Sequence, residues 1–280
     1  MPFACVSCHK TTHWWGVACP HCRAPDALYA VEPVPAHDPG NRPAASPVEK
    51  LSEVSSAQTR YLTTGFSPLD HVLGGGLARG AVYLLAGEPG AGKSTLALTI
   101  ADHVSARCGS LYVSGEEPTA RLAERARRLG LGCAALDVCA ITEMNHLARA
   151  VRRAHVRLVV VDSLNVLHSD KIRSRVGSPS QLLNSAIALV RLAKSQNCAI
   201  LLIGHVTKSN QLTGPRSVEH YCDAMLHFNA VGKTNRRSLF ASKNRFGPAF
   251  ISLQFLMTET GLVPDHQKRS VDFPGIERVS

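Results

Sequence analysis

The sequence predicts an α/β protein with a mainly parallel sheet, antiparallel strands toward its C-terminal end and a small metal module near its start. Short β-branched or apolar runs alternate with helical patterns from about residue 60 to residue 205. A glycine-rich stretch joins one such run to the helix that follows, and four cysteines in the first 22 residues form two Cys-x-x-Cys pairs. These observations indicate βαβ units preceded by an independently stabilised metal-binding module.

The composition is that of a globular protein. The 280 residues suffice for one well-packed domain of roughly 200 residues plus a small module. Apolar residues make up 45% of the chain, but the longest apolar runs fall far short of the ~20 residues of a membrane helix. No secretion signal opens the chain, so we expect a cytoplasmic protein without a membrane partner. The formal net charge of +10 favours a polyanionic partner.

Composition also divides the chain into four parts. Residues 1–30 are expected to form a four-cysteine zinc finger, and residues 31–57, rich in Pro, Ala, Ser and charge, a flexible linker. Residues 58–262 carry the strand and helix patterns of the α/β domain, and residues 263–280 are expected to form a C-terminal tail.

The elements of the α/β domain follow from its apolar patterns. Strands are predicted at 80–87, 110–115, 136–141, 157–164 and 198–205, and helices at 93–107, 118–129, 143–155 and 180–196. This alternation implies a parallel sheet covered on both faces. From residue 221 three runs follow one another, "AMLHFNA", "RRSLFASK" and "AFISLQFLM", with turns at 232–235 and 242–248. We expect these runs to extend the sheet in antiparallel fashion.

The cysteine spacing is typical of a structural zinc site. Two knuckles separated by ten residues can place four thiolates around one tetrahedral Zn²⁺ and leave no open position for catalysis. The predicted ligands are Cys5, Cys8, Cys19 and Cys22. Three histidines, His9, His13 and His21, are alternative donors, but the symmetric pairs favour the cysteines. Trp14 and Trp15 form either the core of this module or an exposed surface for stacking on a base or a partner.

The glycine-rich stretch fits the pattern G-x4-G-K-[ST] between a predicted strand and a predicted helix. Backbone N–H groups of such a loop converge on the β-phosphate, and the helix N-terminus adds its positive dipole. Lys93 is expected to reach the β- and γ-phosphate oxygens, and Ser94 to offer a hydroxyl to Mg²⁺. The residues predicted to bind ATP are Gly87, Glu88, Pro89, Gly90, Ala91, Gly92, Lys93, Ser94 and Thr95.

Carboxylates follow two of the predicted strands. Asp162 ends the apolar run 158–161 and is expected to hold Mg²⁺ through water. Glu116 and Glu117 follow the strand after the P-loop helix, where a carboxylate can face the γ-phosphate and polarise the attacking water. Either glutamate could do this, while the other complements the N-terminal dipole of the next helix.

Taken in order, these motifs resemble the bacterial RadA (Sms) family, RecA-like and DnaB-related ATPases of recombination and repair. The resemblance rests on the cysteine spacing and on "TTGFSPLDHVLGGGLARGAVYLLAGEPGAGKSTL", "YVSGEEP", "VVVDSLNVL", "GPRSVEHYCDAML" and "KNRFG". It covers about residues 5–260 and implies a RecA-like P-loop ATPase fold. In that family a Lon-protease-like domain follows the ATPase. Since the chain ends shortly after the ATPase, we expect a short form without that domain and without protease activity.

The resemblance also implies that the loops after the fourth and fifth strands line a central channel and hold single-stranded DNA. These loops, 168–180 and 205–217, are basic and contain Gly and Ser, which suits contact with backbone phosphates. The predicted DNA-binding residues are Lys171, Arg173, Arg175, Lys208 and Arg216. His205 resembles the residue that senses nucleotide state, although a buried, hydrogen-bonded histidine would also fit.

The stretch "SKNRFGP" at 242–248, read alone, would be a solvated hairpin turn. In a ring of P-loop domains the nucleotide lies at the subunit boundary, where Lys243 and Arg245 could complete the neighbour's catalytic site in the manner of an arginine finger. These two residues alternate with Asn244 and so can project to one side of an extended backbone. Phe246 and Gly247 are expected to anchor and turn it.

Together these features predict an ATP hydrolase, DNA-stimulated and helicase-like, that forms a homo-oligomeric ring, expected to be a hexamer. It would move on single-stranded DNA and promote strand exchange or branch migration in recombinational repair, with ATP, Mg²⁺ and Zn²⁺ as cofactors. The zinc finger could contact a recombinase or helicase. Two alternatives are a KaiC-like regulatory ATPase, whose output is protein phosphorylation or assembly, and a DNA-binding module that uses ATP only as an assembly switch.

Overall fold

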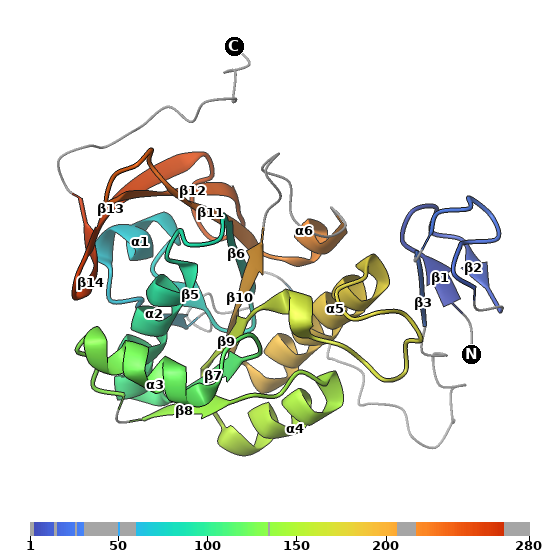
Figure 1. The fold of residues 1–280 in the computed structure, drawn as a ribbon, viewed down its shortest axis with the longest axis horizontal. Helices are drawn as coiled ribbons and strands as arrows, with labels where there is room; N and C mark the ends of the chain where they lie inside the picture. Colours follow the sequence, from blue (N-terminus) through green and yellow to red (C-terminus); the bar gives the residue numbers. More distant parts are fainter. Residues whose placement is uncertain are drawn as a thin grey trace, which may run out of the picture.

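The computed structural model describes residues 3–13, 16–25, 27–30, 50, 60–133, 135–205 and 217–265. Within these residues the chain forms a three-stranded sheet near its N-terminal end and a nine-stranded sheet with helices on both faces (Figure 1). A two-stranded ribbon completes the sheets of this part of the chain. The predicted class, a mainly parallel α/β sheet with antiparallel C-terminal strands behind a cysteine-rich module, is confirmed.

The N-terminal module is a small antiparallel sheet in the order β2-β1-β3. Its strands are β1 (Phe3–Cys5), β2 (Thr11–Thr12) and β3 (Leu28–Ala30). Its buried apolar cluster contains only Cys5, Cys19, Ala27 and Leu28 within the described residues. So small a core needs further stabilisation, and a bound metal ion is one way to supply it.

Five parallel strands form the centre of the large sheet, in the order β6-β10-β9-β7-β8. They are β6 (Val82–Gly87), β7 (Ser110–Ser114), β8 (Leu136–Cys139), β9 (Leu158–Asp162) and β10 (Ala199–His205). Every residue of β6, β7 and β9 is buried. Burial on both faces explains why these strands are continuous apolar runs rather than alternating ones.

Helices cover both faces of this sheet. They are α2 (Lys93–Cys108), α3 (Thr119–Arg128), α4 (Met144–Ala154) and α5 (Pro179–Gln196). Buried residues of α2 and α3 join one apolar core, and those of α4 and α5 join a second. Val160 belongs to the first core and its neighbours Val159 and Val161 to the second, because successive side chains of a strand point to opposite faces.

Four further strands extend the sheet beyond β6. They are β11 (Ala224–Ala230), β12 (Arg236–Asn244), β13 (Ile251–Thr258) and β14 (Gly261–Pro264). Strands β11, β12 and β13 pair with one another in antiparallel fashion, as predicted, and β14 adds one more antiparallel strand. On its other side β11 pairs in parallel with β6. The long connection before β11, which includes α6 (Ser217–Tyr221), allows the crossover that a parallel pair requires.

Several short elements carry too little periodicity to be predicted. They are β4 (Tyr61–Leu62), α1 (Ser67–Val72), β5 (Leu77–Ala78), the 3-10 turn η3 (Leu164–Val166) and β14. The glycines after α1 have a packing role. A Cβ atom on Gly74 would lie 2.0 Å from the carbonyl oxygen of Phe246. The loop after α1 therefore lies directly against the turn at 242–248.

The topology separates two edges of the parallel sheet. Strands β6, β9 and β10 end at Gly87, Asp162 and His205, and these ends define the carboxyl edge. Strand β12 runs in the opposite direction and ends at Asn244, which pairs with Ala224 at the amino edge. The P-loop and the turn at 242–248 thus lie at opposite ends of β6, roughly 20 Å apart at 3.3 Å per residue.

The predicted linker and the predicted C-terminal tail are described only in small part. The linker 31–57, apart from Lys50, and the tail beyond Asp265 lie outside the described residues. The last strand ends at Pro264, just past the predicted domain boundary at residue 262. Among the helices of the described ranges, none is both long enough and apolar enough to cross a bilayer.

Candidate functional site

The glycine-rich loop leaves β6 at Gly87 and enters α2 at Lys93, in the strand–loop–helix context that its pattern requires. Gly92 caps the helix with φ at 102°, a left-handed conformation that residues with a Cβ atom rarely adopt. A Cβ atom on Gly87 would lie 1.9 Å from the carbonyl oxygen of Phe228 on β11. Glycine at position 87 therefore allows the loop to pack closely against the sheet.

Lys93 lies inside this loop rather than in solvent. Its Nζ donates hydrogen bonds to the carbonyl oxygens of Gly87 (2.7 Å) and Glu88 (2.8 Å), and the residue is 5% exposed. Burial lowers the pKa of Lys93, and the charges of Asp162, Glu116 and Glu88 oppose that shift. The ammonium group is therefore placed where it can exchange two carbonyl oxygens for phosphate oxygens.

Asp162 ends β9 as a buried carboxylate. Tyr112, fully buried on the neighbouring strand β7, donates a hydrogen bond from its hydroxyl to Asp162 Oδ2 at 2.7 Å. Burial, together with the charge of Asp162, raises the pKa of Tyr112 far above its ordinary value, so the hydroxyl keeps the proton that it donates. This hydrogen bond uses Oδ2, so Oδ1 is the oxygen through which Asp162 could support a Mg²⁺ ion.

The two glutamates after β7 have different surroundings. Arg125 of α3 binds Glu117 with both terminal nitrogens, at 2.9 Å from Oε1 and 3.0 Å from Oε2. Glu116 is exposed, accepts a hydrogen bond from the hydroxyl of Ser163, and lies near enough to Lys93 for their charges to interact. Glu117 thus ties the segment to α3, whereas Glu116 is the one of the two carboxylates whose charge acts on Lys93 of the P-loop.

Two residues of the C-terminal strands form hydrogen bonds with the P-loop, and no motif in the sequence indicates these contacts. Asn229 Oδ1 accepts a hydrogen bond from the backbone N–H of Glu88 at 3.2 Å. Arg237 Nε donates to the carbonyl oxygen of Ala91 at 2.9 Å. These contacts join residues 141 and 146 positions apart, so only the fold brings them together.

The loop 168–180, which joins η3 to α5, is organised by the buried side chain of Gln181. Gln181 Oε1 accepts a hydrogen bond from the backbone N–H of Ser169 at 2.9 Å. Its Nε2 donates to the carbonyl oxygens of Ser169, Ile172 and Ser174 at 3.1 to 3.2 Å. Three predicted DNA-binding residues of this loop are exposed: Lys171, Arg173 and Arg175. The loop thus folds around one amide group and leaves its cations at the surface.

The other predicted DNA-binding residues, Lys208 and Arg216, lie outside the described residues. His205 is the last residue of β10, and its backbone lies opposite Gly87 in the parallel ladder. This backbone position is next to the P-loop, which is where a nucleotide-sensing residue is needed. The sensing role of His205 stays a prediction.

Lys243 and Arg245 both contact the segment that leads from α6 into β11. Lys243 Nζ donates to the carbonyl oxygen of Glu219 at 2.8 Å. Arg245 Nη1 lies 3.1 Å from Asp223 Oδ1, and the Arg245 side chain is 59% exposed. The two cations therefore contact the same segment of their own domain, at the amino edge of the sheet.

The rest of this turn is anchored in the core. The ring of Phe246 packs against that of Tyr83, with centroids 5.9 Å apart, and Asn244 Nδ2 donates to the carbonyl oxygen of Val72 at 2.7 Å. A Cβ atom on Gly247 would lie 2.5 Å from the same Val72 oxygen. The anchoring residues fix the position from which Lys243 and Arg245 project.

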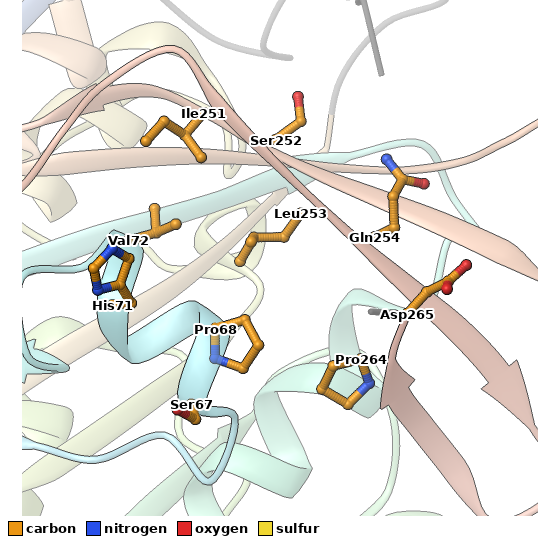
Figure 2. A pocket seen from close by; sticks show the side chains of 10 residues that line it. All are labelled: Ser67, Pro68, His71, Val72, Ile251, Ser252, Leu253, Gln254, Pro264 and Asp265. Atoms are coloured by element: carbon orange, nitrogen blue, oxygen red, sulfur yellow. The ribbon is translucent and has the colours of Figure 1, made fainter. Parts of the chain in front are cut away.

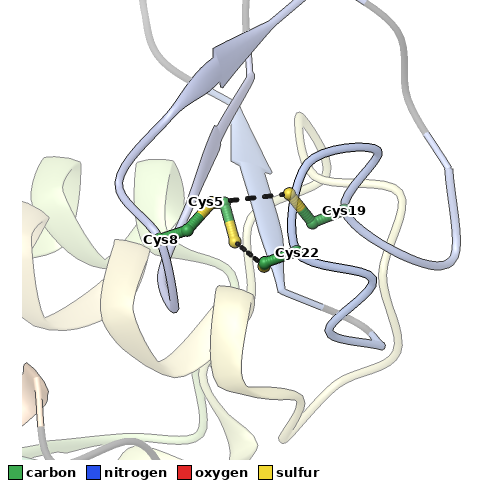
Figure 3. A group of neighbouring side chains, drawn as sticks. All are labelled: Cys5, Cys8, Cys19 and Cys22. Carbon is green, nitrogen blue, oxygen red and sulfur yellow. Dashed lines mark hydrogen bonds between the residues drawn. The ribbon is translucent and has the colours of Figure 1, made fainter.

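The four predicted zinc ligands converge in the N-terminal module (Figure 3). Their sulfur atoms all lie within 4.8 Å of one another, with 3.5 Å between Cys5 and Cys22 and 3.7 Å between Cys8 and Cys19. Tetrahedral coordination with Zn–S bonds of about 2.3 Å requires sulfur atoms about 3.8 Å apart. The four sulfurs therefore fit one zinc ion, which would hold the module together as a closed site.

The alternative donors near this cluster do not join it. Among the described residues His9, His13 and His21 are all outside the group of converging ligand atoms. The geometry therefore supports the four-cysteine set. Trp14 and Trp15, predicted as core or stacking residues, lie outside the described residues.

A separate cavity of about 680 Å³ lies between α1 and β13 (Figure 2). Ser67 and His71 line it from α1, Gln254 from β13, and Pro264 and Asp265 from the end of the described chain. None of the predicted site residues that the structure describes lines this cavity. It is therefore separate from the site at the carboxyl edge.

Comparison with known proteins shows the family of the chain. Residues 47–211 match the AAA domain family. The chain belongs to this family. It is 38% identical over 264 residues to DNA repair protein RadA of Pseudomonas aeruginosa and 36% identical over 269 residues to that of Bacillus subtilis. Each alignment covers 93% of this chain and 58% of the relative. The resemblance to RadA is confirmed, and the chain spans a little over half the length of these relatives.

A solved structure shows the same fold. The crystal structure of the RadB recombinase superposes with a TM-score of 0.56, at 24% identity, and covers 72% of this chain and 98% of that chain. This match confirms the RecA-like architecture of the large sheet and its helices.

Loss of zinc is expected to unfold the N-terminal module but not the α/β domain that carries the P-loop. Cys5→Ser removes one of four ligands, so the purified variant should retain far less than one zinc per chain, measured by elemental analysis. Binding of a fluorescent ATP analogue should be unchanged. Cys108→Ser, which alters a half-buried thiol outside the cluster, is the matched control and should keep its zinc. Parallel loss of zinc and nucleotide binding in Cys5→Ser would show that the two units are not independent.

Proposed function

We propose that this chain is an ATP hydrolase that binds single-stranded DNA and moves along it, as part of a ring, in recombinational DNA repair. One observation carries the proposal: the P-loop, a buried aspartate, an exposed glutamate and a cationic loop all follow strands that end at one edge of the parallel sheet. Ligands of open α/β sheets bind outside this edge. The name of the relatives, DNA repair protein RadA, agrees with the proposal.

ATP would bind with its β- and γ-phosphates in the loop between β6 and α2. The N–H groups of the loop and the N-terminal end of α2 attract negative charge. Lys93 would leave the carbonyl oxygens of Gly87 and Glu88 and donate to phosphate oxygens instead. Because Lys93 is already buried, this exchange requires little new desolvation.

Ser94 and Asp162 fit a Mg²⁺ site, since hard cations prefer oxygen ligands. Ser94 lies in the first turn of α2, and Asp162 is held in place through Oδ2 by Tyr112. When bound, Mg²⁺ would neutralise charge on the β- and γ-phosphates. Ser94 would offer its hydroxyl to the ion, and Asp162 would support the ion through water.

Glu116 is the residue that we propose to activate the attacking water. Its carboxylate, oriented by Ser163, would accept a proton from water as the water oxygen bonds to the γ-phosphorus and ADP departs. Glu117 is less suited to this role because its carboxylate is occupied by Arg125.

Lys243 and Arg245 are proposed to complete the ATP site of a neighbouring subunit. They lie at the amino edge, roughly 20 Å from the P-loop of their own chain, which is too far for contact with its nucleotide. Asp223 also accepts a hydrogen bond from the backbone N–H of Val82 at 2.9 Å. The exposed guanidinium of Arg245 can therefore leave Asp223 without stranding that carboxylate and can stabilise charge on a γ-phosphate supplied in trans.

The loop 168–180 is proposed to contact the DNA backbone through its exposed cations. It is also linked closely to the ATP site, because only Ser163, η3 and Leu167 separate it from Asp162. Binding of nucleotide at Asp162 can therefore change the position of this loop, and DNA held by the loop can in turn affect the carboxylates.

Single-stranded DNA is expected to stimulate ATP turnover at low salt, and Lys93→Ala is expected to abolish turnover with and without DNA. The measurement is steady-state phosphate release. A wild-type rate that DNA does not change would favour the KaiC-like regulatory ATPase or the ATP-switched module instead. Retained turnover in Lys93→Ala would contradict the assignment of the P-loop.

The same assay distinguishes the contribution of the loop 168–180 from that of the catalytic site. Gln181→Leu removes the amide that shapes the loop 168–180, so DNA stimulation should fall while DNA-independent turnover persists. Gln196→Leu, at the other end of α5, is the matched control and should keep both activities.

The two glutamates should respond differently to neutralisation. Glu116→Gln should lower kcat by roughly 100-fold or more, the usual contribution of a general base, with little change in the KM for ATP. Glu117→Gln weakens the contact with Arg125 and should lower thermal stability while most of kcat remains. The opposite pattern in steady-state kinetics would assign the catalytic role to Glu117.

Arg245→Ala should spare ATP binding and eliminate most DNA-stimulated turnover. Mixing it with Lys93→Ala subunits should restore part of the activity, because the intact P-loop of one subunit meets the intact Arg245 of its neighbour. Arg236→Ala, which also alters an arginine paired with an aspartate, is the control and should keep its activity unmixed. Absence of restoration over a range of mixing ratios would refute action in trans.

A further inference from the structure

The amino edge of the parallel strands carries arginines that the proposed mechanism does not use. Arg79 precedes β6, Arg157 directly precedes β9, and Arg107, in the last turn of α2, precedes β7. Arg60 precedes β4, which pairs with β5 next to Arg79. We refer to these four residues as the amino-edge arginines.

Main-chain contacts hold this group together. The backbone N–H of Arg79 donates to the carbonyl oxygen of Arg60 at 3.0 Å, and that of Arg157 donates to the carbonyl oxygen of Gly109, just after α2, at 3.2 Å. Strands β6, β10, β9 and β7 are consecutive neighbours in the sheet. With about 4.8 Å between neighbours, the arginines at their starts span roughly 15 Å.

The positive charges of this group have no carboxylate partner among the described residues, where no Asp or Glu forms an ion pair with any amino-edge arginine. The side-chain partners of Arg79 and Arg107 are the carbonyl oxygen of Asn197 and the residue His103. Asp223, which precedes β11 at the same edge, is already paired with Arg245. In the part of the chain that the structure describes, the arrangement therefore has no anionic partner.

The arginines are also close enough for their charges to act on one another. Burial lowers the pKa of Arg79, and the neighbouring charges of Arg157 and Arg60 lower it further. The charges of Arg79, Arg157 and Arg107 all act on the thiol of Cys108, whose pKa burial raises. Such mutual repulsion would be relieved by a bound anion.

Helix dipoles explain only part of this cluster. Arg107 lies in the last turn of α2, and Arg79 donates to the residue that caps the C-terminus of α5, where cations are favoured. Arg60 and Arg157 belong to no helix, and their side chains form no hydrogen bond within the described part of the chain. These two cations, both close enough to Arg79 to affect its pKa, thus have no hydrogen-bond or ion-pair partner for their side chains among the described residues.

We propose that the amino-edge arginines form a second nucleic-acid contact surface that binds the phosphodiester backbone, at the sheet edge opposite the loop 168–180. Guanidinium groups match phosphate oxygens in geometry as well as in charge. A nucleic acid offers about one charge per 3.4 Å of each strand, a repeat that suits a row of cations better than an isolated anion does. Further exposed cations lie in the last turns of α4 and α5: Arg152, Arg153 and Lys194.

The test uses Arg60→Gln combined with Arg157→Gln, because neither side chain takes part in a described hydrogen bond and folding should be spared. Fluorescence anisotropy with labelled single-stranded and duplex oligonucleotides, titrated at several salt concentrations, measures affinity. We expect about tenfold weaker binding near 0.1 M salt and a slope of log affinity against log salt that is smaller by about two for duplex DNA. The oligonucleotide that shows this change is the one that the surface contacts.

Two controls make the result specific. Arg121→Gln combined with Arg149→Gln removes the same charge from exposed positions on α3 and α4 and should leave the slope unchanged. Arg60→Lys combined with Arg157→Lys should retain the slope, because the charges remain. Equal weakening in the Arg121 and Arg149 control would mean that net charge alone is responsible, which overturns the proposal.

The proposal can fail independently of the proposed motor function. It is overturned if the Arg60 and Arg157 variant binds both oligonucleotides normally, or if it loses self-association by light scattering while nucleic-acid binding is unchanged. The first result would show that the amino-edge arginines do not bind nucleic acid. The second would show that they contact another copy of the chain instead. DNA-stimulated ATP turnover, which reports on the opposite edge, should persist in the variant at saturating DNA.

Discussion

The site at the carboxyl edge depends on one buried cation, the ammonium group of Lys93. It is held by the carbonyl oxygens of Gly87 and Glu88, and the charges of Asp162, at the end of β9, and of Glu116, just after β7, act on it. A charge held away from water interacts strongly with an incoming phosphate. The surrounding hydrogen bonds serve to fix this arrangement: Tyr112 orients Asp162, Ser163 orients Glu116, and the strands beyond β6 support the loop from behind.

The direction of the strands gives each subunit two different ends. Strands β6, β9 and β10 bring the P-loop and its carboxylates to one edge, whereas the antiparallel strand β12 brings Lys243 and Arg245 to the other. In the proposed ring, these cations would complete the nucleotide site of a neighbouring chain, because they lie too far from that of their own chain. The packing of Phe246 against Tyr83 holds the turn at 242–248 in place, as the proposed contact with a neighbouring subunit requires.

The elements that depend on local pattern were predictable from the sequence, and those that depend on distant contacts were not. The P-loop and the strand ending at Asp162 follow from a glycine pattern and an apolar run. The parallel direction of β11 depends on a crossover connection that leaves no periodic signal. Asn229 and Arg237 support a loop more than 140 positions away. The sequence could not show which of the two glutamates after β7 activates water either, because only the fold places Arg125 of α3 against Glu117.

The most direct test of the central claim is a structure of the assembled protein with a non-hydrolysable ATP analogue, Mg²⁺ and single-stranded DNA, determined by electron cryo-microscopy. We expect Lys93 to donate to the β- and γ-phosphates instead of to the carbonyl oxygens of Gly87 and Glu88. We also expect Arg245 of the adjacent subunit to lie within hydrogen-bonding distance of the γ-phosphate. A bound nucleotide with Arg245 still paired to Asp223 in every subunit, or with Lys93 still on its carbonyl oxygens, would contradict the proposed site.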